Sequence, residues 1–240
     1  MIESIPGLDG LPFWIPSAPN LVTHELREGR QWEPYLSALY PIACPGGWTI
    51  EVGAYCGEHT IEILKYGKVA AFEPQAIPYS CLVVNLTLRA ADGWEAQRRG
   101  LYDGLRTRLS LQTHPEYGVA HPSSDYVPLD TGEAADAIDK IWNQRRVSLL
   151  KIDAQGCDLP ILHGAEAIIR YHRPLIVCEF EPALAEQHGH TAADYRGWFA
   201  QHGYEIRGFP GNNILGWWRD DARGLRCCEA LTAQGIELTT

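Results

Sequence analysis

Short apolar runs alternate with amphipathic stretches along most of the chain. The runs at residues 48–52, 69–73, 147–152 and 175–180 are too short for helices and predict buried strands. The stretches at 58–65, 78–91, 159–170 and 191–202 have helical spacing, and Thr191 with Asp194 resembles a capping box. This alternation predicts an α/β fold with a doubly wound, mostly parallel sheet covered by helices on both faces.

Weaker patterns complete the expected fold. Residues 95–99 predict a further strand, residues 136–142 a helix, and residues 103–130 loops with short antiparallel strands. Residues 204–209 and 213–218 flank Pro210-Gly211 and predict a closing C-terminal antiparallel hairpin.

The first 45 residues have a different character, being rich in proline and aromatic residues. We expect residues 1–45 to form an irregular lead-in with one short helix near 32–39, placed over the core or as a substrate lid. Residues 46–240 then form the main domain. The N-terminus lacks the basic flank and apolar core of a signal peptide, and no apolar run is long enough for a membrane span. We therefore expect a cytoplasmic protein with no membrane partner.

Charge and cysteine usage narrow the functional classes. The 30 acidic and 20 basic residues give a formal net charge of −10, which argues against a nucleic-acid partner because phosphates would be repelled. The seven cysteines are scattered without a Cys-x-x-Cys pair, which argues against a structural zinc site and for a reducing compartment.

Ligands of parallel α/β sheets bind at the carboxyl ends of the strands. The first strand continues into Glu51-Val-Gly-Ala-Tyr-Cys-Gly57, whose glycines permit close backbone approach to a ligand. The Gly-x-x-x-Gly spacing disfavours an NAD-dependent oxidoreductase, which needs Gly-x-Gly-x-x-Gly. Tyr55 in the turn and the charge of Glu51 suit a ligand with an ammonium and a sulfonium better than phosphates. The alternative is a strand–helix turn without function, and His59 just beyond it is expected to face solvent.

Acidic residues end the other strands. Glu73 follows the second strand in Phe72-Glu-Pro74, where a carboxylate can accept hydrogen bonds from both ribose hydroxyls of an adenosine. Lys151 and Asp153 project to one side of the fourth strand. The fifth strand ends in Glu179-Phe-Glu181. These carboxylates could orient a substrate hydroxyl, act as a general base, or hold a divalent cation. A structural ion pair and solvated strand ends are the competing interpretations.

Taken together, these motifs resemble the FkbM family of methyltransferases over residues 47–182. The resemblance rests on Glu51-Val-Gly-Ala-Tyr-Cys-Gly57, Phe72-Glu-Pro74, Lys151-Ile-Asp-Ala-Gln-Gly156, Leu162-His-Gly-Ala165 and Arg173-Pro-Leu-Ile-Val-Cys-Glu179. It implies a class I methyltransferase (Rossmann-like) fold that uses S-adenosylmethionine. It also implies O-methylation of a hydroxyl on a sugar, glycan or secondary metabolite, with a small-molecule or glycan acceptor as the partner.

The resemblance also implies roles for single residues. Gly100-Leu-Tyr-Asp-Gly104 is similar to the segment that frames the adenine. The implied cofactor-binding set is Glu51, Gly53, Ala54, Tyr55, Gly57, Thr60, Glu73, Pro74, Leu101, Tyr102 and Asp153. In catalysis, Asp153 would orient the hydroxyl or act as its base, Lys151 would tune Asp153, and Glu179 would assist. No metal ligand is assigned.

The chain departs from the family pattern at three positions. Glu51 replaces an Asp, Tyr55 replaces an Asn, and Gln155 replaces a Glu, which removes a charge. Tyr55 and Gln155 leave open an alternative function, a non-catalytic binding or scaffold protein that keeps a degenerate methyltransferase fold.

Overall fold

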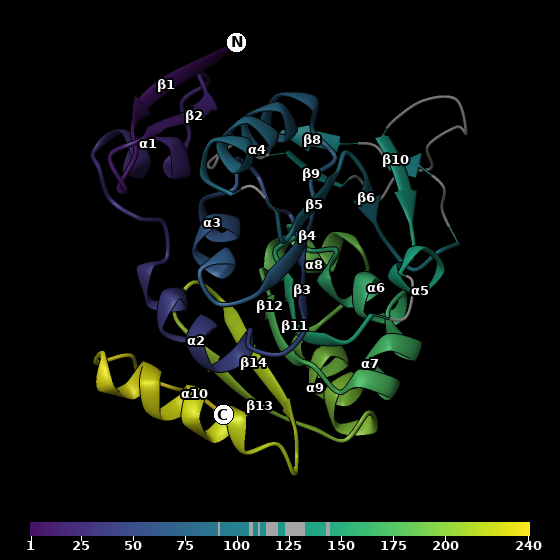
Figure 1. Cartoon of the computed structure of the whole chain (residues 1–240). Helices are drawn as coiled ribbons and strands as arrows, with labels where there is room; N and C mark the ends of the chain where they lie inside the picture. The colour runs from purple at the N-terminus through teal and green to yellow at the C-terminus, as the bar shows by residue number, and fades with distance from the viewer. Residues whose placement is uncertain (91, 106–107, 110, 114–119, 123–132, 143–144) are drawn as a thin grey trace.

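A seven-stranded sheet runs through the centre of the molecule (Figure 1). The computed structural model describes residues 1–90, 92–105, 108–109, 111–113, 120–122, 133–142 and 145–240. In spatial order the strands are β5 (Trp94–Gln97), β4 (Lys68–Phe72), β3 (Trp48–Val52), β11 (Val147–Ile152), β12 (Leu175–Glu179), β14 (Asn213–Trp218) and β13 (Tyr204–Phe209). Of the seven strands in this sheet, β14 alone runs in the opposite direction to the other six. The predicted Rossmann-like sheet with a C-terminal antiparallel hairpin is therefore confirmed.

Helices cover the two faces of this sheet. One face packs against α5 (Ile138–Ile141), α6 (Asp158–His163), α7 (Glu166–His172) and α9 (Ala192–Gln201). The other packs against η1 (Pro34–Ala38), α2 (Tyr40–Ala43), α3 (Glu58–Leu64), α4 (Ala76–Arg89) and α10 (Ala222–Ala233). Successive strand residues alternate between the two cores: Leu150 and Ile152 enter the first and Leu149 the second. Among the described helices, none is long and apolar enough to cross a membrane.

Smaller elements connect and flank the sheet. Strands β8 (Leu111–Thr113) and β9 (Ala120–Pro122) pair antiparallel, as predicted within 103–130, and the remainder of that prediction lies partly outside the described residues. Strand β10 (Glu133–Asp136) lies between β6 (Gly100–Leu101) and β7 (Arg108–Leu109). Helix α8 (Pro182–Gln187) follows β12.

The prediction of a single helix over residues 159–170 is wrong, because α6 and α7 are separate helices. Gly164 caps the C-terminus of α6, and a Cβ atom there would collide with the carbonyl oxygen of Tyr102, so this close contact requires glycine between the two helices. The carboxylate of Asp139 then accepts hydrogen bonds from the backbone amides of Ala167 and Ile168, in the first turn of α7. A tertiary contact and a distant cap thus divide a continuous helical pattern.

Helix α10 was not predicted from the sequence. Its apolar stripe is narrow, since Cys227 and Leu231 are its fully buried hydrophobic residues. They lie one turn apart and pack onto the β14 side of the second core. Tertiary packing rather than a broad amphipathic pattern stabilises this helix.

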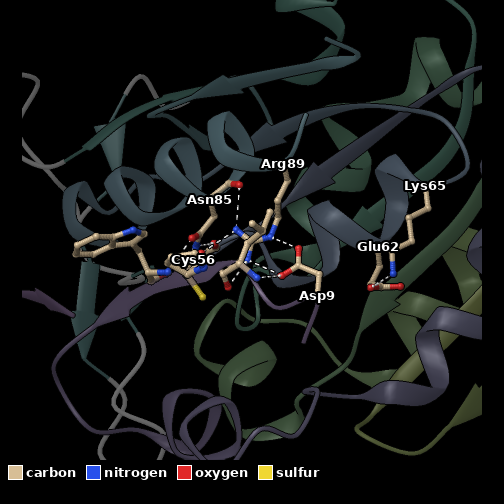
Figure 2. A network of polar contacts seen from close by, with 9 residues as sticks. Asp9, Cys56, Glu62, Lys65, Asn85 and Arg89 are labelled. Atoms are coloured by element: carbon tan, nitrogen blue, oxygen red, sulfur yellow. Dashed lines mark hydrogen bonds and ion pairs between the residues drawn. The ribbon is translucent and has the colours of Figure 1, made fainter. Parts of the chain in front are cut away.

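The N-terminal segment is more regular than expected. Residues 1–45 contain a hairpin of β1 (Ile2–Pro6) and β2 (Pro12–Pro16), then α1 (Leu21–Arg27), η1 and α2. Asn85 of α4 fixes the hairpin: its side chain exchanges two hydrogen bonds, each 2.7 Å, with the backbone of Trp14, and its Nδ2 also donates to the carbonyl of Cys56 at 2.9 Å (Figure 2). Arg89 adds an ion pair with Asp9. The hairpin and the loop after β3 are therefore held by one buried amide.

Replacing Asn85 with leucine should destabilise the protein by about 3 kcal/mol, because three backbone groups would lose buried partners. Urea unfolding followed by circular dichroism measures this change. Thr87→Ala on the exposed side of the same helix removes only a local hydrogen bond to Val83 and is the matched control. Equal unfolding midpoints for the two variants would contradict the role given to Asn85.

Candidate active site

A cavity of about 310 Å³ opens at the carboxyl ends of β3, β4, β11 and β12. Its wall is completed by Leu21 and Val22 of α1, by Trp32 and Glu33 ahead of η1, and by Asn213 at the start of β14. The volume is within the range of small-molecule sites. The N-terminal segment thus lies over the sheet edge where the sequence predicts ligand binding.

Most of the predicted site residues line this cavity: Glu51, Gly53, Ala54, Tyr55, Glu73, Pro74, Leu101, Lys151, Asp153 and Glu179. Gly57, Thr60 and Tyr102 are placed behind the wall. Gly57 precedes α3 with a φ of 89° and packs against Leu82. Thr60 donates to Glu51. The hydroxyl of buried Tyr102 lies 3.4 Å from Nδ1 of His188.

The loop after β3, residues 53–57, is called the glycine loop. It passes directly over the chain that follows β11. Gly53 has a φ of 80°, and a Cβ atom there would collide with the carbonyl oxygen of Asp153. Only glycine permits both the left-handed conformation and this approach. Tyr55, two residues further along the loop, also has a positive φ. Its hydroxyl accepts a hydrogen bond of 2.8 Å from Nδ2 of Asn20. The tyrosine ring is thus tied to the N-terminal segment.

Glu73 is buried at the end of β4. Its carboxylate accepts hydrogen bonds from the backbone amides of Tyr55, at 3.0 Å, and Gln75, at 2.8 Å. Burial raises its pKa to about 7, although both amides oppose the shift. A carboxylate has about four acceptor positions. Glu73 can therefore fix the glycine loop and still accept hydrogen bonds from a ligand in the cavity.

Glu51 and Lys151 form a buried ion pair between the two central strands. They are register partners on β3 and β11, and Nζ of Lys151 lies 3.5 Å from Oε1 of Glu51. Thr60 donates a 2.6 Å hydrogen bond to the other carboxylate oxygen. Burial alone would lower the pKa of Lys151, but Glu51 and Asp153 raise it above its usual value. The lysine is therefore a buried cation held by carboxylates.

Gln155 joins the two predicted catalytic carboxylates. Its Nε2 atom donates to Asp153 and to Glu179, each at 3.1 Å. Burial, together with Asp153 and Asp158, raises the pKa of Glu179 well above the usual value. A glutamate at position 155 would add a third carboxyl group here, whereas the amide of Gln155 gives each neighbouring carboxyl group a donor.

Three cavity residues were missed or misplaced by the sequence analysis. Glu33 and Glu58 line the cavity, and His59, which was expected to face solvent, is only 8% exposed. That expectation was wrong because η1 and α2 cover the start of α3, so the Tyr40 hydroxyl lies 3.0 Å from Nδ1 of His59. Glu58 and His59 directly follow the glycine loop, and this position could have identified them as cavity residues. Glu33 has no comparable local signal.

The cavity wall is strongly acidic. Its acidic residues are Glu33, Glu51, Glu58, Glu73, Asp153, Glu179 and Glu181, whereas Lys151 is the one lysine or arginine that lines it in the described part of the chain. Within the same residues, no group of three His, Cys, Asp or Glu side chains could hold a metal ion. The acidic wall suits a positively charged ligand.

Comparisons with known proteins agree with this geometry. The family model described as the methyltransferase FkbM domain matches residues 51–206. No curated protein matches the chain.

Similar solved structures include three methyltransferases. An FkbM methyltransferase from Methylobacillus flagellatus KT has a TM-score of 0.49 and 18% identity, with 72% of this chain and 43% of that chain covered. A putative tRNA methyltransferase from Streptococcus pneumoniae, in complex with S-adenosyl-L-methionine, has a TM-score of 0.48 and 13% identity, with coverage of 76% and 69%. A precorrin-6y C5,15-methyltransferase from Geobacter metallireducens GS-15 has a TM-score of 0.48 and 14% identity, with coverage of 86% and 94%. The chain thus spans less than half the length of the first of these proteins.

Replacing Lys151 with methionine should destabilise the protein by about 3–5 kcal/mol, because Glu51 would remain buried without a cation. Chemical unfolding measures the loss. The double variant Glu51→Gln/Lys151→Met should recover part of it, because both charges are then removed. Equal losses in the single and double variants would contradict a role for the ion pair.

Proposed function

This chain belongs to the FkbM family of methyltransferases, and on that basis we propose that it transfers a methyl group from S-adenosylmethionine to a hydroxyl oxygen. The proposed acceptor is a sugar, a glycan or a secondary metabolite. The observation that carries the proposal is that the glycine loop, Glu73 and Asp153 line one cavity. The acidic wall and the net charge of −10 favour a small-molecule or glycan acceptor over nucleic acid.

The residues present fit S-adenosylmethionine. Gly53 offers a bare backbone surface, since a side chain there would meet Asp153. Glu73 keeps acceptor capacity for the ribose hydroxyls beyond its two amide partners. Gly100 and Leu101 supply an apolar rim at the β6 end of the cavity for the adenine. When bound, S-adenosylmethionine supplies a methyl group on a positively charged sulfur, which keeps the bonding electrons as the methyl leaves.

Asp153 is the proposed catalytic residue. Its carboxylate would accept a hydrogen bond from the acceptor hydroxyl, aim the oxygen at the methyl carbon, and take the proton as the new bond forms. Gln155 holds Asp153 and Glu179 in place through its two 3.1 Å hydrogen bonds. Lys151 and Glu179 act by fixing the charge and position of Asp153. Gln155 stands where the family pattern has a glutamate. Its uncharged side-chain amide donates to both carboxyl groups, so the relative positions of Asp153 and Glu179 are kept.

S-adenosylhomocysteine should bind the wild-type protein with micromolar affinity, and Glu73→Ala should weaken binding by about tenfold or more, because the ribose hydroxyls lose a charged acceptor. Isothermal titration calorimetry measures both. Glu62→Ala, on α3 but outside the cavity, where its carboxylate is paired with Lys65, is the matched control and should bind as the wild type does.

The pH dependence provides a further check. Because the pKa of Glu73 is raised to about 7, wild-type affinity should fall as pH drops through 7 and the carboxylate gains a proton. Glu73→Gln should lack this dependence. Absence of binding to the wild-type protein would contradict the proposed cofactor.

Asp153→Asn should lower kcat by about 100-fold or more while leaving the affinity for S-adenosylhomocysteine within about twofold. The measurement is transfer of radiolabelled methyl groups to alcohol and sugar acceptors. Asp220→Asn, at an exposed position away from the cavity, should keep full turnover. Full turnover in Asp153→Asn would remove its catalytic assignment. Cofactor binding without turnover on any acceptor, in the wild type, would favour the scaffold alternative.

A further inference from the structure

The cavity holds more carboxyl groups than its one lysine and the proposed cofactor can pair with. Seven carboxylate residues and one lysine line it, and Lys151 is already paired with Glu51. S-adenosylmethionine carries a sulfonium, an ammonium and a carboxylate, which gives a net charge of +1. Charged groups enclosed away from water need partners. A second positively charged ligand would supply them.

Three of these residues, Glu33, Glu179 and Glu181, accept hydrogen bonds from uncharged side chains. Glu33 accepts hydrogen bonds from the Tyr35 hydroxyl, at 2.6 Å, and from Nδ2 of Asn213, at 2.8 Å. Glu181 accepts from Nδ2 of Asn212 at 2.7 Å. These donors are neutral, as is Gln155 beside Glu179. The carboxylates are thus oriented by neutral groups around an acceptor position next to Asp153.

Two further polar atoms of cavity-lining residues lack partners in the described part of the chain. They are Oε1 of Glu58 and Nε2 of His59, whose residue is only 8% exposed. The other ring nitrogen of His59 is taken by the Tyr40 hydroxyl, and Nε2 lies 3.9 Å from Glu58, beyond hydrogen-bond range. Since buried polar atoms are rarely left unsatisfied, these two indicate a ligand group in the cavity.

The chemistry of the missing group follows from these two atoms. Oε1 of Glu58 accepts from an ammonium or a hydroxyl when the carboxyl group is ionised, and burial, which raises the pKa of this group to about 8, also allows its protonated form to donate to a hydroxyl. Nε2 of His59 donates or accepts according to its tautomer, and a hydroxyl can satisfy either form. A ligand that combines ammonium and hydroxyl groups therefore matches both atoms and the acidic wall. The described side chains offer no cluster for a metal ion, which favours an organic cation.

We propose that the methyl acceptor is a hydroxylated amine of the amino-sugar class, with an ammonium group paired to Glu33 and Glu179 and a polar group donating to Glu58. The reacting hydroxyl lies at Asp153. This inference rests on the proposed function for the identity of the reaction, but it concerns binding of the amine, which is measured separately.

The test is calorimetric titration of the full chain with glucosamine and with kanamycin, each beside its N-acetylated form, in the presence and absence of S-adenosylhomocysteine. The free amines should bind at least about tenfold more tightly than the acetylated forms, because acetylation removes the charge and keeps the hydroxyls. Equal affinities, tighter binding of the acetylated forms, or no binding of either amine would overturn the inference. Failure of S-adenosylhomocysteine to bind is a separate result, which would overturn the proposed function.

Glu33→Gln identifies the residue responsible. The Gln oxygen can still accept from Tyr35 and Asn213, so the fold is kept while one charge is lost. It should weaken amine binding by about tenfold and leave the acetylated forms unchanged. Glu181→Gln provides a second variant at the same wall if Glu33→Gln unfolds. Glu186→Gln, exposed on α8, loses the same charge outside the cavity and should change neither affinity. Unchanged amine binding in Glu33→Gln and Glu181→Gln would overturn the assignment.

Discussion

The buried pairing of Glu51 with Lys151 connects every part of the proposed site. The two residues face each other on the central strands β3 and β11, and Thr60 brings α3 to the same carboxylate. The glycine loop begins at Gly53, directly after β3 ends at Val52, and Asp153 directly follows β11. One ion pair therefore fixes the distance between the loop that would hold the cofactor and the carboxylate that would handle the acceptor. A buried pair of this kind specifies geometry more reliably than it adds stability.

The sheet and its functional edge were predictable because their signals are local. The short apolar runs gave the strands within one or two residues, and parallel strands must present their carboxyl ends at the same edge. That rule alone brings Glu73, Asp153 and Glu179 together, although they are far apart in sequence. The glycine at position 53 was also readable, since its spacing implied a turn that needs close backbone approach.

Other features depend on contacts that no local pattern contains. Glu33 is held in the cavity wall by Asn213 at the start of β14, 180 residues later in the sequence. The burial of His59 requires coverage by α2. Gly164 ends a helix because of the backbone of Tyr102, more than 60 residues earlier. In each case a contact between segments remote in sequence overrides the intrinsic pattern, which is the usual limit of reading a single sequence.

The acidic and amide residues of the cavity wall come from different parts of the chain. Asp153 and Glu179 come from within residues 51–206, which the family model matches, whereas Glu33, Asn212 and Asn213 come from the segments on either side of it. The residues proposed to contact the acceptor amine therefore come from both parts, Glu58 and Glu179 from the matched segment and Glu33 from the segment before it. If the proposed roles hold, substitutions in the flanking segments would alter acceptor binding while leaving Gly53 and Glu73, and with them the proposed cofactor contacts, in place.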